Sequence, residues 1–361
     1  MRYFLLLLSA AALLFTSCRQ TREEAVSKEE ALALAREIDA SIENKKPKNF
    51  DNLLNADMLA RRIAQNKGVA ESPAFLQGIK EGFARVNMGN QIIRGLGDKG
   101  TYQLVKHYEK DKVQHLVYRL YADDGLNYHD FELSKEKGKT YIADMYIYLA
   151  GQSFSSLLAD MASAFIQENG KEDREMIAAA ETLKRVKLKM QQGDFAGARK
   201  VFDTEIPEQA AKEKMFRLMS IQISSELNEE KYVKELTDYQ QAFPDDPNSY
   251  LLLIDLHFLQ KEYDKALTSI NMLDKLIDKD PFLDYYRALV YNMKQQPDLA
   301  ISHLESLYKQ YPGFESGVLE LIACYLEAKE TEKANAIIEV YQNNPQFDQL
   351  LLQQVISMYG Q

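Results

Sequence analysis

Three of the five histidines, His107, His115 and His129, fall in one stretch of about 25 residues. Imidazole exchanges protons near neutral pH, so a pocket with His107, Tyr118 and His129 could carry acid–base or ligand-binding chemistry. A structural interpretation competes with it, in which each ring lies at the edge of a core and hydrogen-bonds to neighbours. The sequence holds no HExxH, GxSxG, glycine-rich phosphate loop or paired-cysteine motif. We therefore predict no metal and no cofactor.

The segments around these histidines are rich in Tyr, Val, Leu and Ile, and they alternate between apolar and polar residues. The turn signals EKDK, DDG and KEKGK separate them. A period of two with such turns predicts a four-stranded antiparallel meander with one apolar and one mixed face. The predicted strands are residues 101–109, 112–122, 126–135 and 139–149.

The predicted turns set the register of this sheet. A two-residue turn at 124–125 places Tyr118 opposite Phe131 and Arg119 opposite Asp130.

A first turn at 110–111 places His107 on the face of Tyr118 and His129, with His115 on the other face. Asp144 could lie on the same face as His107, Tyr118 and His129, because the turn KEKGK before its strand does not determine which residues the strand pairs with.

Helices are predicted before the sheet. Ser27 and Glu30 form a capping-box pattern ahead of apolar residues at helical spacing, which predicts a helix over about 28–43. Two more helices are expected over 49–66 and 73–96. Helices followed by a curved antiparallel sheet resemble the cystatin-like or nuclear-transport-factor-two-like cones. The resemblance implies an α+β domain over 27–152, of a kind that carries ligand pockets or serves as a dimerisation or docking module.

The second half of the chain repeats. The segments GDFAGARKVF, KEYDKALTSI, QQPDLAISHL and KETEKANAII contain Ala198, Ala266, Ala300 and Ala334, which are 68, 34 and 34 residues apart. Residues 229–247 supply the missing unit, with Glu235 in place of the alanine. This pattern resembles the tetratricopeptide repeat, a 34-residue helix–turn–helix whose second helix opens with a small residue.

The resemblance implies an all-α superhelix of about five repeats over 174–346. A helix and loop over 153–173 bridge it to the α+β domain, and a helix over 347–361 caps it. His257 and Cys324 fall on packing positions.

In the tetratricopeptide family, partners bind the concave surface that the first helix of each repeat lines. That surface would be apolar here, which favours an apolar helix or extended segment as partner. Alternatively, the N-terminal domain or the capping helix of the same chain fills it. The implied groove residues are Leu251, Asp255, Phe258, Phe282, Tyr285, Leu289, Asn292, Leu319 and Leu326.

The N-terminus reads as an export signal. Arg2 precedes an apolar run of about a dozen residues, too short to span a membrane, and Thr16 and Ser17 precede Cys18. This order resembles a bacterial lipoprotein signal, with Phe15 where Leu is usual. The resemblance implies a signal peptide over 1–17, a lipid on Cys18 and a polar tether over 18–26. Simple signal cleavage and an uncleaved anchor are the alternatives.

The net charge of the chain excludes one class of partner. The net charge is −10, which argues against nucleic acid as a partner. We therefore expect a membrane-anchored, non-catalytic scaffold that binds another cell-envelope protein or peptide segment. A small-ligand-binding or hydrolytic α+β domain on a helical support is the alternative, and a part of a larger outer-membrane uptake or assembly machine is a third reading. By analogy with enteric bacteria, Arg19 after the cysteine favours the outer over the inner membrane. Neither the membrane face nor the oligomeric state follows from the sequence.

Overall fold

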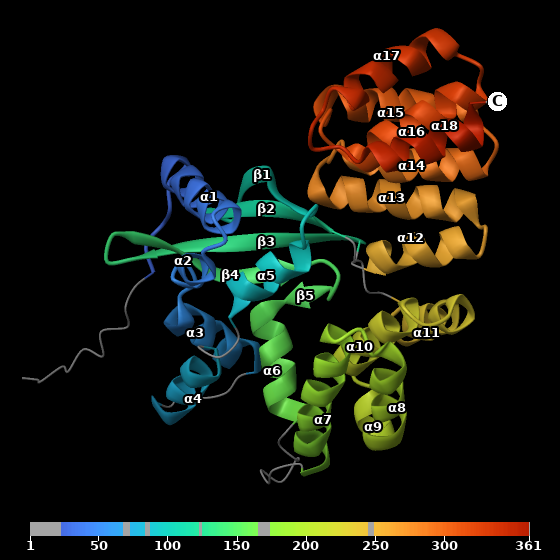
Figure 1. Ribbon diagram of the computed structural model, residues 1–361. Helices are drawn as coiled ribbons and strands as arrows, with labels where there is room; N and C mark the ends of the chain where they lie inside the picture. Colours follow the sequence, from blue (N-terminus) through green and yellow to red (C-terminus); the bar gives the residue numbers. More distant parts are fainter. Residues whose placement is uncertain are drawn as a thin grey trace, which may run out of the picture.

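The computed structural model describes residues 23–67, 73–83, 87–122, 125–164, 174–244 and 249–360. Within them the fold is mixed: a five-stranded antiparallel sheet lies in the middle, with helices before and after it in the chain (Figure 1). The predicted signal peptide, Cys18 and Arg19 lie outside the described residues. No helix in the described ranges combines the length and apolar character needed to cross a bilayer.

The first helix begins at the predicted capping box. Helix α1 (Lys28–Glu43) has Ser27 at its N-cap, where the Glu30 amide donates to the Ser27 hydroxyl and the Ser27 amide donates to the Glu30 carboxylate. The predicted second helix is in fact two, α2 (Pro47–Asp51) and α3 (Ala56–Lys67). Asn55 causes the break, because its side chain accepts hydrogen bonds from two amides of α3. The predicted third helix is also two, α4 (Pro73–Phe83) and α5 (Met88–Leu96).

The sheet follows the chain order, and each strand pairs antiparallel with the next. Its fifth strand is a two-residue addition to the predicted meander. The β1–β2 turn is at Asp111 and Lys112, one residue later than predicted, and both have the positive φ of a tight hairpin turn. The strands are β1 (Thr101–Lys110), β2 (Val113–Ala122), β3 (Gly125–Glu136), β4 (Lys139–Ile147) and β5 (Gln152–Ser153).

The register between β2 and β3 differs from the predicted one. Tyr118 pairs with His129 and Arg119 with Tyr128, because Ala122 pairs directly with Gly125. The shift is two residues along β3. Since side chains alternate with a period of two, the shift changes each partner but leaves every side chain on its predicted face.

The two faces of the sheet pack against different parts of the chain. On one face, Leu116, Tyr118 and Phe131 form a core with the helices that precede the sheet. On the other, Val117 and Tyr128 pack against residues of α12 to α14. The sheet is therefore an inner layer that touches both halves of the molecule.

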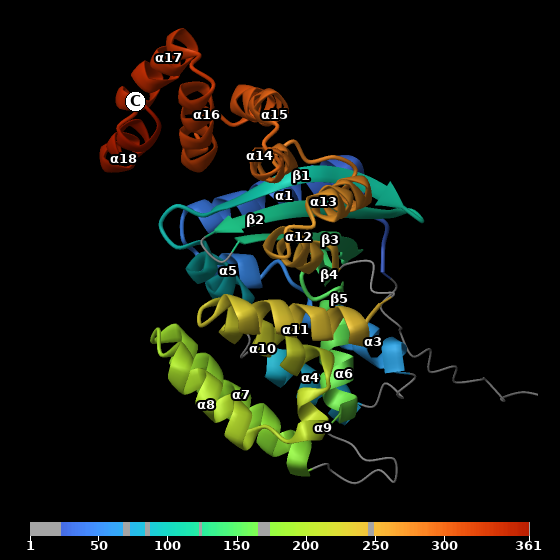
Figure 2. The same cartoon turned by 90° about the vertical axis from the view of Figure 1, so that its right-hand side faces the viewer.

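The helices after the sheet run from α6 to α18. Helix α6 (Phe154–Ala164) follows β5, and consecutive later helices pack as hairpins. Figure 2 shows α12 and α13 lying over the sheet, with α14 to α18 above and α7 to α11 below. Helix α18 packs against α16 and closes the stack. The bounds are α7 (Arg174–Gln191), α8 (Phe195–Glu205), α9 (Glu208–Ala211), α10 (Lys214–Ser225), α11 (Glu229–Ala242), α12 (Tyr250–Leu259), α13 (Tyr263–Ile277), α14 (Leu283–Met293), α15 (Pro297–Gln310), α16 (Glu315–Glu327), α17 (Thr331–Gln342) and α18 (Gln349–Tyr359).

The four alanines at the repeat spacing each lie in the second helix of a hairpin, and all four are fully buried. A small side chain there lets two helices approach closely. Glu235, which replaces alanine in α11, is accommodated by Arg199, whose guanidinium lies 3.1 Å from its carboxylate.

Candidate functional site

Tyr118 and His129 lie side by side in the core beneath the sheet, but they do not bond to each other. The Tyr118 hydroxyl donates to the Ala35 carbonyl and to Asp39. The His129 ring is 2.9 Å from the Tyr102 hydroxyl at Nδ1. Burial lowers the pKa of His129 to about 4, so its ring is neutral near pH 7.

His107 lies apart from this pair. It shares their face of the sheet, opposite Leu116, but its Nε2 bonds to the Gln114 side chain at 2.6 Å. Each of the three predicted pocket residues thus has a hydrogen-bond partner close by. In the described part of the chain, none of the three lines the cavity beside Asp144.

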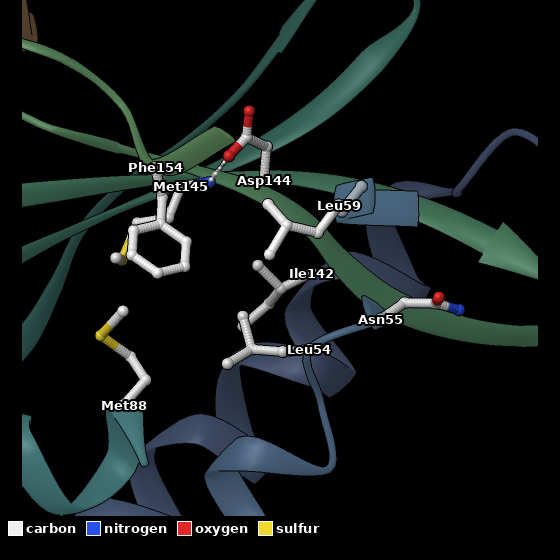
Figure 3. Close-up of a pocket in the computed structure, with 9 residues that line it drawn as sticks. Leu54, Asn55, Leu59, Met88, Ile142, Asp144, Met145 and Phe154 are labelled. Atoms are coloured by element: carbon white, nitrogen blue, oxygen red, sulfur yellow. Dashed lines mark hydrogen bonds between the residues drawn. The ribbon is translucent and has the colours of Figure 1, made fainter. Parts of the chain in front are cut away.

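Asp144 does not join the histidines either. Its carboxylate accepts hydrogen bonds from the amides of Met145 and Ser155 and from the Ser155 hydroxyl, so it caps the start of α6. A cavity beside it has a volume of about 10 Å³, roughly the space of one water molecule. Figure 3 shows that its wall is mostly apolar. Its lining is Leu54, Asn55, Leu59, Met88, Ile142, Ala143, Asp144, Met145 and Phe154.

The opposite face of the sheet carries a polar pair that the predicted register does not reveal. Arg119 is paired with Asp280, from the loop between α13 and α14, and not with Asp130. Its Nη1 donates to both Asp280 oxygens at 2.6 and 2.7 Å, and its Nη2 donates to Gln103. Tyr128 is a second side chain that donates to Asp280, with its hydroxyl 2.9 Å away.

This interface pair, Arg119 and Asp280, is almost completely buried: the side chains are 1% and 0% exposed. The guanidinium also stacks on the Phe282 ring, 4.2 Å from its centroid. Burial alone would lower the pKa of Arg119, but the charge of Asp280 and the hydrogen bonds to Asp280 and Tyr311 together outweigh it, and the net shift is upward. Arg119 therefore stays charged, and its bonds to Asp280 join the sheet to the helix hairpins.

A second polar group on this face joins Tyr108, His115 and Asp130. The Tyr108 hydroxyl donates to Asp130, and His115 Nδ1 lies 3.0 Å from the same carboxylate. The rings of Tyr108 and His115 stack with centroids 4.7 Å apart. Asp130 thus has partners on two neighbouring strands, which explains why it does not pair with Arg119.

The predicted groove residues fall into two groups. Those near the N-terminal ends of α12 and α14 lie against the sheet: Phe282 is 2% exposed and packs on Tyr121, with ring centroids 4.9 Å apart. Leu251 is buried in the cluster that includes Val117 and Tyr128, and half-buried Tyr285 packs on Phe282. The chain itself therefore covers this part of the predicted groove.

The second group lies further along α12 and α14 and reaches solvent. Two residues outside the prediction adjoin it: Met293, next to Asn292 on α14, and Glu320 on α16, which accepts a hydrogen bond from Asn292. We call these six residues the open strip: Asp255, Phe258, Leu289, Asn292, Met293 and Glu320. Met293 is 50% exposed, Asp255 is exposed, and the other four are half-buried. Leu319 and Leu326, also predicted for the groove, are half-buried and pack with the cluster around α18.

Both carboxylates of the open strip are hydrogen-bonded by neutral groups. The Tyr232 hydroxyl donates to Asp255 at 2.8 Å, and the Asn292 side chain donates to Glu320 at 2.7 Å. Burial raises the pKa of half-buried Glu320, and its hydrogen bond from Asn292 offsets only part of the shift. The negative charge of Glu320 is thus poorly compensated within the described structure.

The remaining predicted residues have packing roles. His257 is buried and its Nδ1 lies 3.2 Å from Glu262. Cys324 is buried beside Asn292, and burial raises the pKa of its thiol to about 11, so it stays protonated. Among the residues that the structure describes, no three His, Cys, Asp or Glu side chains gather closely enough to hold a metal ion.

Comparison with known proteins gave no match: no family model, no curated protein and no solved structure resembles the chain. Functional inference therefore depends on the geometry of its own residues.

Proposed function

We propose that this protein is a membrane-anchored, non-catalytic interaction scaffold of the cell envelope. In this proposal Cys18 carries the lipid, the sheet and its preceding helices form a cone-like α+β domain, and the hairpins from α7 onward form a tetratricopeptide superhelix. The buried alanines at the repeat spacing support the repeat assignment. Arg19 favours the outer membrane, and the net charge of −10 disfavours nucleic acid.

The open strip is the observation that carries the proposal. It offers apolar surface at Leu289 and Met293, and it lies where the sheet leaves the first helices of the hairpins uncovered. Exposed apolar surface next to fixed polar groups is typical of sites that bind another protein.

The two carboxylates of the open strip indicate the charge of the partner. Asp255 and Glu320 each accept a hydrogen bond from a neutral donor, so a cationic side chain placed beside either carboxylate would be attracted to it. The proposed partner is a segment of another envelope protein that combines apolar side chains with lysine or arginine.

Site-specific photocrosslinking in intact cells tests this proposal. A photoreactive residue at Met293 should give a discrete adduct, whereas the same residue at Met272 should not. Met272 is the matched control because it is 41% exposed but lies on α13, outside the strip.

Charge reversal then tests the chemistry of the partner. Asp255→Lys and Glu320→Lys should each abolish the adduct formed at Met293, since both would repel a basic segment. The proposal is wrong if both positions give the same adduct, or if neither reversal weakens it.

A further inference from the structure

The described chain begins in a segment that is fixed to the body of the molecule. Residues 23–26 fall in the polar tether predicted from sequence, yet Glu24 forms an antiparallel bridge with Lys135 near the end of β3. The Glu24 amide donates to the Lys135 carbonyl at 2.8 Å, and the Lys135 amide donates back at 3.1 Å. Val26 is buried in the core. These residues are therefore not a free linker.

Glu23 makes the strongest attachment. Arg62 donates to both Glu23 oxygens, at 2.9 and 2.8 Å, and the Ser134 hydroxyl donates to one of them at 2.9 Å. Arg62 also pairs with Glu132, so its own charge is balanced. The hydrogen bonds and charge of Arg62 lower the pKa of Glu23 to about 2. We call this arrangement the N-terminal clasp: Glu23, Glu24, Arg62, Ser134 and Lys135.

The clasp lies beside the β3–β4 turn, at the end of the sheet remote from the helix hairpins. Figure 1 shows this turn at the far left, with α12 to α18 on the right. The tip of the turn is Lys137 and Gly138, and Lys137 and Lys139 are exposed. Each of these two lysines can contact the phosphate of a lipid headgroup and adds a small attraction to an anionic surface.

Chain length then limits where a membrane can lie. Cys18 and Glu23 are five positions apart in the chain, and an extended chain covers about 3.3–3.6 Å per residue, or roughly 17 Å in all. If the chain were unattached as far as residue 26, the extended tether from Cys18 would be longer by more than half. The clasp therefore keeps an acylated Cys18 close to one end of the sheet.

We propose that the N-terminal clasp orients the protein on a lipid surface. The β3–β4 turn faces the lipid, and the helix hairpins with the open strip point away from it, toward a partner. This inference rests on the lipid anchor of the proposed function. It adds a surface and an orientation that the anchor alone does not give.

Fluorescence quenching by lipid tests the orientation. Acylated protein carrying Lys137→Cys or Val340→Cys is labelled with a fluorophore and placed on phosphatidylcholine vesicles that contain brominated lipid. Val340 is the matched position because it is exposed on α17, in the last hairpin. Buried Cys324 is protected from the label. We expect quenching at position 137 and little at position 340; equal quenching at both would overturn the proposal.

The clasp variants show whether the clasp causes the orientation. Glu23→Gln combined with Arg62→Gln should abolish the difference between the two positions, whereas Glu29→Gln, on an exposed carboxylate six residues away, should preserve it. A difference that survives clasp removal overturns the proposal. Glu23→Gln alone, with thermal unfolding measured beside it, separates a loss of orientation from a loss of fold. Protein that fails to float with the vesicles refutes the lipid anchor, and this inference with it.

Discussion

The two faces of the five-stranded sheet are both covered, but by different chemistry. On one face, Tyr118, His129 and Phe131 form a core in which every polar group is neutral or locally hydrogen-bonded. On the other, Arg119 and Asp280 form an ion pair with almost no exposure to water. The first face joins the sheet to helices that precede it, as in the bond from Tyr118 to Ala35, 83 positions away, whereas the second joins residues 161 positions apart.

The difference indicates how the two halves of the molecule are fixed together. Apolar contacts tolerate small shifts, but a buried charge has one acceptable partner in one geometry, because leaving it unpaired is costly. The ion pair therefore defines how the hairpins sit on the sheet, and so which part of the predicted groove stays open.

The largest expected effect is on the charged face. Asp280→Ala leaves the Arg119 guanidinium buried without its counter-ion, so we expect the free energy of unfolding in urea to fall by about 3–5 kcal/mol. Asp278→Asn, in the same loop, is the control. Asp278 pairs with Lys106 at the surface, where water screens the charges, so losing this pair should change the stability little. Equal losses from both variants would mean that the interface pair has no special role.

The neutral face should be sensitive to acid. His129 has a folded-state pKa of about 4, against an ordinary value of 6.5. Because the pKa of His129 is lower in the folded state, the unfolded chain binds a proton between pH 6.5 and 4 that the folded chain does not bind. The stability is therefore unaffected by His129 above pH 6.5, and it falls as the pH decreases from 6.5 toward 4. The loss is about 3 kcal/mol, since each pKa unit corresponds to about 1.4 kcal/mol.

Urea unfolding at pH 7.0 and pH 5.0 measures this acid dependence. His129→Gln should reduce the difference in stability between the two pH values. If the wild type and His129→Gln have the same pH dependence, His129 is not neutral and buried as described.

The smallest effect expected is on a single hydroxyl of the neutral face. Tyr118→Phe removes the hydrogen bonds to the Ala35 carbonyl and to Asp39, which tie α1 to the sheet. We expect a loss of about 1 kcal/mol, the usual net value of a hydrogen bond. Tyr141→Phe, at a half-buried position on β4, is the control and should change little. A loss from Tyr118→Phe as large as that from Asp280→Ala would contradict the distinction between the two faces.

The sequence predicted much of the local structure because local structure follows from backbone periodicity. Alternation with a period of two located β1 to β4 within a few residues, and Ser27 with Glu30 marked the start of α1. Asn55 shows the limit: its side chain caps α3, but the sequence around it reads as one continuous helix. The β2–β3 register failed for a similar reason, since DDG permits two turn positions and only the observed pairing distinguishes them.

The candidate site was less predictable. Phe282 and Asp255 occupy equivalent kinds of position in the predicted groove, yet one is buried beneath Tyr121 and the other reaches solvent. Nothing in the repeat pattern distinguishes them, because the sheet that covers Phe282 comes from a different part of the chain. The sequence contained one indication of this. Arg119 is a single charged residue in the apolar stretch VYRLYA, which is expected where a charged side chain is buried against a partner from elsewhere in the chain.

By itself, the sequence determined the elements: the strands, the capping box and the hairpin spacing marked by Ala198, Ala266, Ala300 and Ala334. Tertiary structure alone decided the partners: Asp280 for Arg119, Arg62 for Glu23 and Tyr121 for Phe282. The physical reason is that periodicity acts over one or two turns of backbone. A charge or ring buried far along the chain, in contrast, finds its partner only when whole elements pack together.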